Sequence, residues 1–279
     1  MKTKSHALFE AYPLQSDVEI PVGRVPTPYQ TYDGHGTLIG GTADLGQVQS
    51  LLQNETVHPL QTEGGRAVMG IWVVDFTEAS LGPHKELQFS FLVAHQPQPP
   101  VASHPLTLLK ALFVNPAARM FCYGLWNDTE TAVAYNRELL GLDAQLTKAE
   151  ITRTNGQKRF RFVNSDGEMI FAGQVQEATR PVARVGWSLL RLLGWRQTVN
   201  ALRRPYLGAK VVNPISDRLP YNADAQSYIA ADQPLIQFFD PATDLIEFGP
   251  ANNGQFDFQP QFIEHFAPFR FVYLNPEKI

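Results

Sequence analysis

The segment AVMGIWVVDFTEASLGPHKELQFSFLVA, residues 67–94, carries the clearest structural signal in the sequence. It begins with an apolar, β-branched run at 68–74 and ends with an alternating run at 87–93. A polar turn and the tripeptide Leu81-Gly82-Pro83 lie between the two runs. This pattern predicts two strands joined by a structured loop that is longer than a two-residue hairpin turn.

Three titratable residues, His84, Lys85 and Glu86, stand at the start of the second strand. Because successive strand residues point to opposite faces, His84 and Glu86 are expected on one face and Lys85 on the other. The positions that follow on the Glu86 face are a mixture of polar and apolar residues. Glu86 is therefore a candidate to point into a cavity, and the alternative is a solvated strand end.

The overall composition is that of a globular protein. The chain has 279 residues, of which 44% are hydrophobic and 18% are charged, which predicts a sizeable packed core. The formal net charge is −4 at pH 7. The chain thus lacks the basic excess of nucleic-acid-binding proteins, and we expect no nucleic-acid partner.

Signals for secretion, membrane insertion and disulfide formation are missing from the sequence. The first residues contain no apolar run typical of a secretory signal, and no window is apolar over the length of a membrane span. Cys122 is the only cysteine, which excludes an intramolecular disulfide and a thiolate zinc cluster. We therefore expect a soluble, cytoplasmic protein.

Motifs for cofactors and metals are also missing. No GxGxxG, GxxxxGK[ST] or GxSxG string occurs, so dinucleotide, P-loop and serine-triad sites are not supported. The histidines do not show HxH, HxxxH or HExxH spacing. The sequence therefore predicts neither a metal site nor a cofactor. The histidines considered are His35, His58, His84, His95, His104 and His265.

The domain organisation is simple. Residues 1–27 are polar, contain three prolines, and are expected to form an arm laid over a single domain at 28–279. Asn155-Gly156 and Asp166-Gly167 predict tight hairpin turns in an antiparallel meander. Strands and helices do not alternate as in a βαβ fold, so we predict a mainly β (α+β) domain with a few helices.

Helical patterns occur at 42–53, 105–113 and 128–140. Asp44 is expected to cap the first of these helices, Asp128 or Thr129 to cap the third, and Gly141 to end it.

Residues 180–216 differ in character, because they contain seven basic residues, no acidic residue, and apolar residues near helical spacing. Trp187 and Trp195 flank that apolar stripe. One interpretation is a helix packed on the sheet. The others are a lid and a peripheral membrane contact attracted by anionic lipid.

The segment WNDTETAVAYNRELLGLDAQL, residues 126–146, resembles the acetoacetate decarboxylase-like superfamily. The corresponding stretch of that family runs acid, Glu, small apolar residues, Gly-Arg-Glu-Leu and then Pro-Lys. The loop LGPHKEL resembles the family's loop with an active-site glutamate, which maps to Glu86, and the closing strands through FRFVYL also match in spacing. The residues that match in register are Asp128, Glu130, Arg137, Glu138 and Leu139.

The resemblance covers roughly residues 24–274, apart from 180–216. It implies a large antiparallel sheet closed into a cone or barrel, with peripheral helices and the site in the interior. It also implies a homo-oligomer.

The sequence departs from this family at the residues that define its chemistry. In the decarboxylases one lysine forms a Schiff base with a β-keto acid, and a neighbouring lysine lowers the pKa of that amine. The two lysine positions fall on Ala144 and Gln145, the proline before them on Asp143, and a substrate-facing arginine on Gly34. Without an amine no iminium can form, so the resemblance points away from a Schiff-base decarboxylase. Lys148 could replace the missing amine only through an odd shift in register, which would reverse its face.

The candidate catalytic residues are Glu86, as an acid–base group with a pKa raised by an apolar interior, and His84 as its proton partner. The alternatives are a loop-anchoring Glu86 and a surface His84. The candidate substrate-binding residues are Tyr32, His35, Tyr123, Trp126, Arg137 and Lys148. The aromatic residues and His35 could instead be plain packing, and Arg137 could brace the end of a helix.

These observations predict a cofactor-free enzyme of specialised metabolism. It would use lyase, hydratase, isomerase or cyclase chemistry on a small apolar carbonyl or carboxylate compound held inside the cone. One alternative is a non-catalytic small-molecule binding protein of the same fold. A second is a decarboxylase that uses Lys148.

Overall fold

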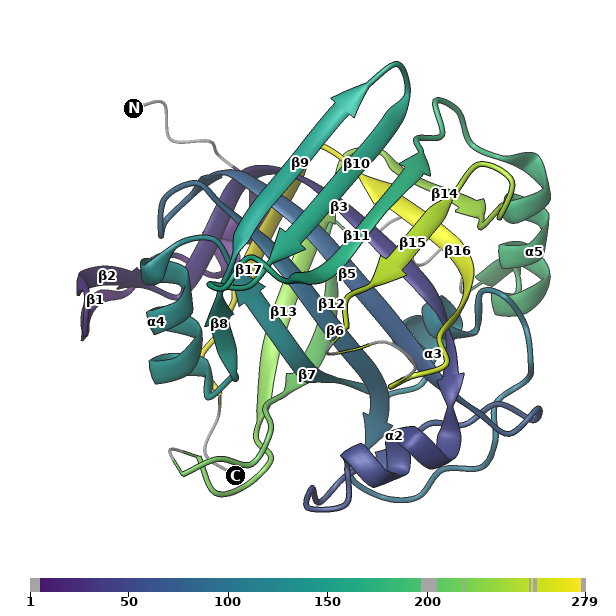
Figure 1. The fold of residues 1–279 in the computed structure, drawn as a ribbon, viewed down its shortest axis with the longest axis horizontal. Coiled ribbons are helices and arrows are strands. Elements are labelled where there is room, and N and C mark those ends of the chain that lie inside the picture. Colours follow the sequence, from purple (N-terminus) through teal and green to yellow (C-terminus); the bar gives the residue numbers. More distant parts are fainter. Residues whose placement is uncertain (1–5, 197–204, 218, 251, 253–254, 277–279) are drawn as a thin grey trace.

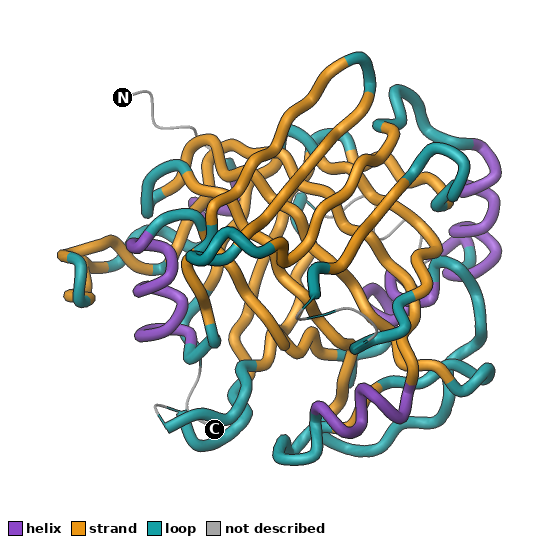
Figure 2. The backbone as a smooth tube through the Cα atoms, viewed as in Figure 1, coloured by secondary structure: helices purple, strands orange, loops and turns teal. Residues whose placement is uncertain are grey.

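The computed structural model describes residues 6–196, 205–217, 219–250, 252 and 255–276. Strands dominate the structure and the helices lie at its periphery (Figures 1 and 2), which confirms the predicted fold class. The helices are α1 (Ala7–Ala11), α2 (Leu45–Leu51), α3 (Thr107–Val114), α4 (Glu130–Leu140) and α5 (Ala183–Leu193).

The strands of the first half of the chain are β1 (Ser16–Ile20), β2 (Gly23–Thr27), β3 (Tyr29–Asp44), β4 (His58–Pro59), β5 (Arg66–Ala79), β6 (His84–Ala94), β7 (Arg119–Asn127) and β8 (Ala144–Leu146). Those of the second half are β9 (Lys148–Thr154), β10 (Gln157–Val163), β11 (Met169–Gln176), β12 (Leu207–Val212), β13 (Asp224–Ala231), β14 (Pro234–Phe238), β15 (Leu245–Phe248), β16 (Gln259–Phe266) and β17 (Phe269–Tyr273).

The large sheet closes into a ring of paired strands (Figure 1). Strands β3, β5, β6, β7, β12, β13 and β17 pair in that order, and β17 pairs again with β3. The sheet is mixed and not wholly antiparallel as expected, because β7 pairs in parallel with both β8 and β12. A long excursion through β9, β10, β11 and α5 separates β7 from β12, and a connection of this length permits a parallel neighbour.

The two faces of the ring strands have different neighbours. On one face, Phe89 of β6 contacts Phe171 of the second sheet, which runs in the order β15-β11-β10-β9. On the other face, Tyr29 of β3 lies against His84 of β6, and Trp72 of β5 lies against Phe266 of β16. These strands are not neighbours in the sheet, so the second face points across the ring. We call it the interior face and the first the outer face.

Aromatic side chains fill much of the interior, and glycines of β3 make room for them. A Cβ atom at Gly36 would overlap the ring of Phe266, and one at Gly40 would overlap the ring of Phe262. The Phe266 ring in turn packs against Phe269, with 5.2 Å between the centroids. The glycine-rich sequence of β3 is thus explained by close approach of aromatic rings to its backbone.

Local signals in the sequence specify the helix ends and the tight turns. The Asp44 side chain accepts a hydrogen bond from the amide of Gln47 at the start of α2, and Thr129 caps α4 in the same way. Gly141 ends α4 in the left-handed conformation, with φ 66°. Asn155-Gly156 forms the predicted turn between β9 and β10, with positive φ at both residues.

The N-terminal segment and residues 180–216 contain more regular structure than the sequence suggested. Strands β1 and β2 form a separate antiparallel hairpin, seen beside α4 in Figure 1. Helix α5 occupies only part of 180–216, and the same segment supplies the ring strand β12. The helical interpretation also covered residues 197–204, which lie outside the described part of the chain. None of the described helices is both long enough and apolar enough to span a bilayer.

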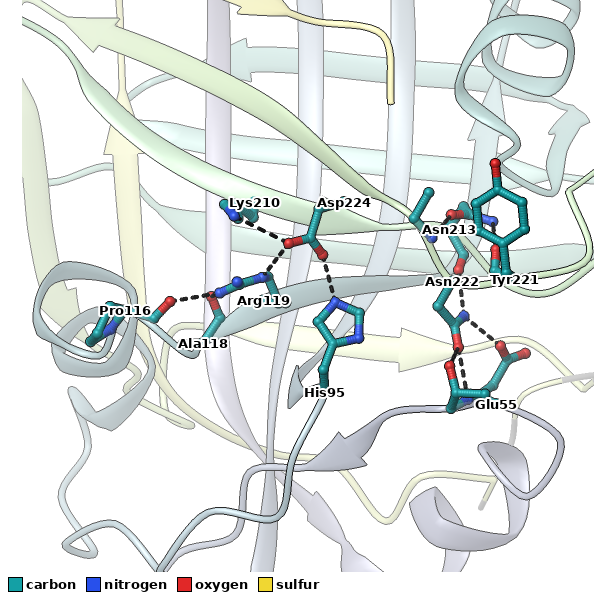
Figure 3. Close-up of polar contacts among 12 residues, drawn as sticks. Glu55, His95, Pro116, Ala118, Arg119, Lys210, Asn213, Tyr221, Asn222 and Asp224 are labelled. Atoms are coloured by element: carbon teal, nitrogen blue, oxygen red, sulfur yellow. Dashed lines mark hydrogen bonds and ion pairs between the residues drawn. The ribbon is translucent and has the colours of Figure 1, made fainter. Parts of the chain in front are cut away.

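A cluster of ion pairs lies where β7, β12 and β13 meet (Figure 3). The Asp224 carboxylate accepts hydrogen bonds from Arg119 Nε at 2.7 Å, His95 Nε2 at 2.8 Å and Lys210 Nζ at 3.3 Å. Burial alone would raise the pKa of Asp224, but the hydrogen bonds from His95 and Arg119 lower it overall. The cluster ties three strands of the ring together at this point.

Candidate functional site

Glu86 lies on the interior face of β6, opposite Val74 of β5 and Asn127 of β7. Its Oε2 accepts a hydrogen bond of 3.0 Å from Asn127 Nδ2. Asn127 is fully buried, and its Oδ1 accepts a hydrogen bond of 2.9 Å from Asn136 Nδ2, which fixes the orientation of the amide. Burial raises the pKa of Glu86 from 4.5 to about 7, although the hydrogen bond from Asn127 opposes this change. The carboxyl group can therefore give or take a proton near neutral pH.

His84 lies two residues before Glu86 on the same face and is 4% exposed. Its Nδ1 donates to the carbonyl oxygen of Gly82 at 2.9 Å, so its Nε2 accepts from the Tyr29 hydroxyl at 3.3 Å. The Tyr29 oxygen accepts in turn from the Thr31 hydroxyl at 2.9 Å. Burial lowers the pKa of His84, which favours the neutral imidazole that this chain of hydrogen bonds requires.

Three further polar side chains share the interior core with Glu86. Burial raises the pKa values of Tyr29, Cys122 and Tyr273, and the nearby charge of Glu86 raises each of them further. The Tyr273 Oη is the buried side-chain atom without a hydrogen-bond partner in the described part of the chain. These groups are neutral at physiological pH and can only donate or accept hydrogen bonds.

The interior also holds a second carboxyl group, on Glu264 of β16. Glu264 pairs in register with Leu38 of β3, whose side chain belongs to the interior core. Burial raises the pKa of Glu264 from 4.5 to about 7. Glu264, Trp72, Glu86 and Gln88 all keep part of their surface accessible, although they share the interior face. The interior is therefore not filled completely.

The two positions on which the resemblance places the amines of the decarboxylases carry none here. Ala144 of β8 is fully buried and belongs to the interior core. Gln145 is exposed. At Gly34, where the resemblance places an arginine, a Cβ atom would lie within 3 Å of the Phe269 ring, so a side chain at this position would require that ring to move.

The remaining predicted residues do not gather around Glu86. Tyr32 packs against Phe9 of α1, with 5.3 Å between the centroids. His35 lies on the outer face, where its Nδ1 accepts a hydrogen bond of 3.1 Å from Arg153. A bulge at residues 31–34 of β3 shifts the alternation and separates these two residues from the interior.

Tyr123 and Trp126 of β7 also face outward. The Tyr123 hydroxyl accepts a hydrogen bond of 2.8 Å from Gln255, and Trp126 packs edge-to-face on Phe89. Arg137 is exposed on α4 and lines a surface depression between that helix and the β1–β2 hairpin. Lys148 is exposed at the start of β9. Of the predicted site residues, the structure thus brings together Glu86 and His84.

The structure contains a buried lysine that was not among the residues predicted from the sequence. Lys158 of β10 is 1% exposed, and its Nζ donates to Thr37 Oγ1 at 3.0 Å and to the carbonyl of Val73 at 3.4 Å. The Thr37 hydroxyl lies 3.2 Å from His265 Nδ1, and His265 Nε2 donates to the carbonyl of Gln176. Burial lowers the pKa of Lys158 to about 8 and that of His265 to about 4.

This amine does not reach the interior, because Thr37 and Val73 alternate with the interior residues Leu38 and Val74 on their strands. The alternating sequence KRFRF at 158–162 was a usable signal for Lys158, since it places the lysine on the same face as Phe160 and Phe162.

Two surface depressions lie elsewhere, beside α2 and beside α4, and neither is lined by Glu86. Within the described ranges, no three His, Cys, Asp or Glu side chains converge as metal ligands would.

Solved structures with the same fold are known. No family model matches the sequence, and no curated protein sequence matches it significantly. An acetoacetate decarboxylase from Legionella pneumophila aligns over 100% of this chain and 97% of its own, with a TM-score of 0.61 and 12% identity. A second acetoacetate decarboxylase structure aligns over 90% of this chain and 89% of its own, with a TM-score of 0.57 and 10% identity.

The enduracididine biosynthesis enzyme MppR, in complex with pyruvate, aligns over 92% of this chain and 93% of its own, with a TM-score of 0.55 and 9% identity. The chain therefore has the acetoacetate decarboxylase-like fold.

Proposed function

We propose that the chain is a cofactor-free enzyme that performs acid–base chemistry on a small apolar carbonyl compound inside the ring, with Glu86 as the proton-transferring group. The observation that carries this proposal is the position of Glu86, an interior carboxyl group with a pKa of about 7 that is held by a hydrogen bond from Asn127. A general acid or base is most effective when its pKa lies near the working pH.

In this proposal the reaction does not proceed through a Schiff base between a lysine and the substrate. Ala144 and Gln145 carry no amine, and Lys158 lies behind the wall of the ring, hydrogen-bonded to Thr37 on the outer face. Lys148, the alternative amine, is exposed. Borohydride reduction in the presence of acetoacetate should therefore leave the protein mass unchanged, whereas an adduct on Lys148 would favour a decarboxylase.

His84 and Tyr29 have a positioning role in this proposal. The Nδ1 hydrogen bond to Gly82 and the Tyr29 hydroxyl at Nε2 hold the imidazole neutral beside Glu86. A neutral His84 adds no positive charge that would lower the pKa of the carboxyl group, so Glu86 keeps its raised pKa.

The test is Glu86→Gln, which preserves shape and hydrogen bonding but cannot exchange a proton. Small ketones and keto acids incubated with the protein in D2O are followed by proton NMR for α-deuteration or elimination. We expect turnover by the wild type with a pH profile that changes near pH 7, and a loss of at least about 100-fold in Glu86→Gln. Glu150→Gln, on the exposed side of β9, is the matched control and should retain full activity. Equal turnover by Glu86→Gln would contradict the proposal.

A second candidate function is a non-catalytic binding protein, which the aromatic lining of the interior favours. Native mass spectrometry of freshly purified protein would then show a retained, unmodified small molecule. Light scattering would test the proposed homo-oligomer, and vesicle binding would test the proposed membrane contact of residues 180–216.

A further inference from the structure

The Tyr273 hydroxyl is a hydrogen-bonding group that no other described side chain or backbone group uses. Tyr273 lies on the interior face of β17, is 7% exposed, and its Oη has no partner among the described residues. Tyr273 pairs in register with Tyr29 of β3, whose hydroxyl lies 3.3 Å from Nε2 of His84, two residues before Glu86 on the same face of β6. A buried hydroxyl without a partner is unfavourable, so a ligand oxygen that pairs with it would be bound preferentially.

The charges on the ring strands define what kind of ligand oxygen this can be. Every lysine and arginine on the ring strands forms an ion pair with an aspartate; these pairs are Arg66–Asp257, Lys85–Asp128, Arg119–Asp224, Lys210–Asp224 and Arg270–Asp232. Glu86 and Glu264, the interior carboxyl groups, form no such pair with any described residue. A carboxylate ligand would therefore meet two acidic groups and no free cation of the ring strands, in surroundings where an unpaired charge is costly.

We infer that the interior takes an uncharged carbonyl compound, whose oxygen accepts a hydrogen bond from Tyr273 Oη while Glu86 removes a proton from the adjacent carbon. This inference rests on the proposed function of Glu86 and names the substrate class. The compounds expected to bind are ketones or enones without a carboxylate, of a size that fits among the aromatic side chains of the interior.

The step is balanced without any co-reactant. The Glu86 carboxylate takes the proton, the C–H electron pair forms a C=C bond, and the C=O π pair moves onto the oxygen. The resulting enolate oxygen accepts the hydrogen bond from Tyr273, which stabilises the charge that develops there. Glu86 then returns the proton to carbon, either at the same position or, in an enone, at the conjugated one.

The test compares cyclohexanone with pyruvate, each followed by proton NMR in D2O for α-deuteration. Wild type should exchange cyclohexanone at a measurable rate and leave pyruvate at the buffer rate. Tyr273→Phe should slow the cyclohexanone exchange at least tenfold, and its thermal midpoint should be unchanged or higher because no hydrogen bond is removed. Tyr228→Phe, on the outer face beside Tyr12, is the matched control and should exchange like wild type.

Each outcome decides between the two proposals. If Glu86→Gln loses exchange but Tyr273→Phe keeps it, the role of Glu86 stands and this inference is overturned. Faster exchange of pyruvate than of cyclohexanone also overturns it. No exchange of either compound by the wild type overturns both proposals.

Discussion

Glu86 and Lys158 are ionisable residues on opposite faces of the ring wall, and both are held in surroundings that favour their neutral forms. Burial raises the pKa of Glu86 from 4.5 to about 7 and lowers that of Lys158 from 10.5 to about 8. The two groups differ in partners: Lys158 donates to Thr37 and Val73, whereas Glu86 keeps one oxygen free of hydrogen bonds to described residues. Lys158 is therefore satisfied in place, and Glu86 is the group available for chemistry.

The lowered pKa of Lys158 predicts how stability depends on pH. Between pH 8 and pH 10.5 the unfolded chain binds more protons at this lysine than the folded chain, so the free energy of unfolding should rise with pH across that window. A shift of this pKa from 10.5 to about 8 corresponds to a rise of at most about 3 to 4 kcal/mol. Urea denaturation at several pH values should show it in wild type but not in Lys158→Met.

Lys148→Met, at an exposed position of the neighbouring strand, should keep the wild-type pH dependence. The interpretation of Lys158 would be wrong if both variants behaved alike.

The sequence could place individual side chains only as far as strand alternation holds. Alternation from Glu86 correctly put His84 on the same face. The resemblance, and not alternation, suggested Tyr32 and Tyr123 as lining residues; both face outward, and bulges in β3 and between β6 and β7 change which residues face inward there. Tyr273 could not be recognised, since its missing partner is a property of the packed interior and not of its neighbours in the chain.

At the scale of elements, α5 combines packing with an exposed basic surface. Val185 is buried, and Leu189 and Leu192 pack on the interior core, which accounts for one side of the helix. Trp187 is 65% exposed on the other side, and Trp195 just beyond the helix is 71% exposed. The packed helix and the membrane contact are therefore compatible, because they use different faces.

Arg184 and Arg191 are exposed on α5, and they should strengthen binding to anionic lipid. Each basic residue near a charged bilayer contributes about 1 kcal/mol, so Arg184→Gln with Arg191→Gln should weaken binding to phosphatidylserine vesicles about 30-fold. Vesicle sedimentation at low and high salt measures this. Removing an exposed apolar side chain elsewhere, as in Leu245→Ala on β15, should have little effect. Binding that does not depend on acidic lipid would contradict the membrane contact.

The ends of helices and turns were predicted correctly where a capping or turn residue lies close by in the sequence. The cap at Thr129, the end at Gly141 and the turn at Asn155-Gly156 are all set by residues within a few positions. Residues 180–216 had no such signal for β12, because a strand of that length is defined by its pairing with β7 and β13. Apolar residues near helical spacing made the whole segment look helical.

At the scale of the whole molecule, ring closure depends on its shortest junction. Strands β7 and β12 pair through only Val211 with Met120 and Val212 with Phe121. The Asp224 cluster lies at this junction and joins Arg119 of β7 to Lys210 of β12 (Figure 3). Asp224 is 16% exposed and Arg119 is 13% exposed, so solvent screens their interaction only in part.

Asp224→Asn should therefore weaken closure of the ring and lower the free energy of unfolding by ~2 kcal/mol or more, because it leaves Arg119 without a counter-charge. Asp232→Asn is the matched control. It breaks the ion pair between Asp232 and Arg270, in which the Asp232 side chain is 48% exposed, and should cost at most ~1 kcal/mol.

Since the pKa of Asp224 is lowered below 3.8 in the fold, the difference in stability between wild type and Asp224→Asn should disappear as the pH falls below the pKa of folded Asp224. Urea denaturation measures the free energies, and amide hydrogen exchange should show faster opening of β7 and β12. Equal losses in the two variants would mean that the junction is held by strand pairing and packing without the ion pairs.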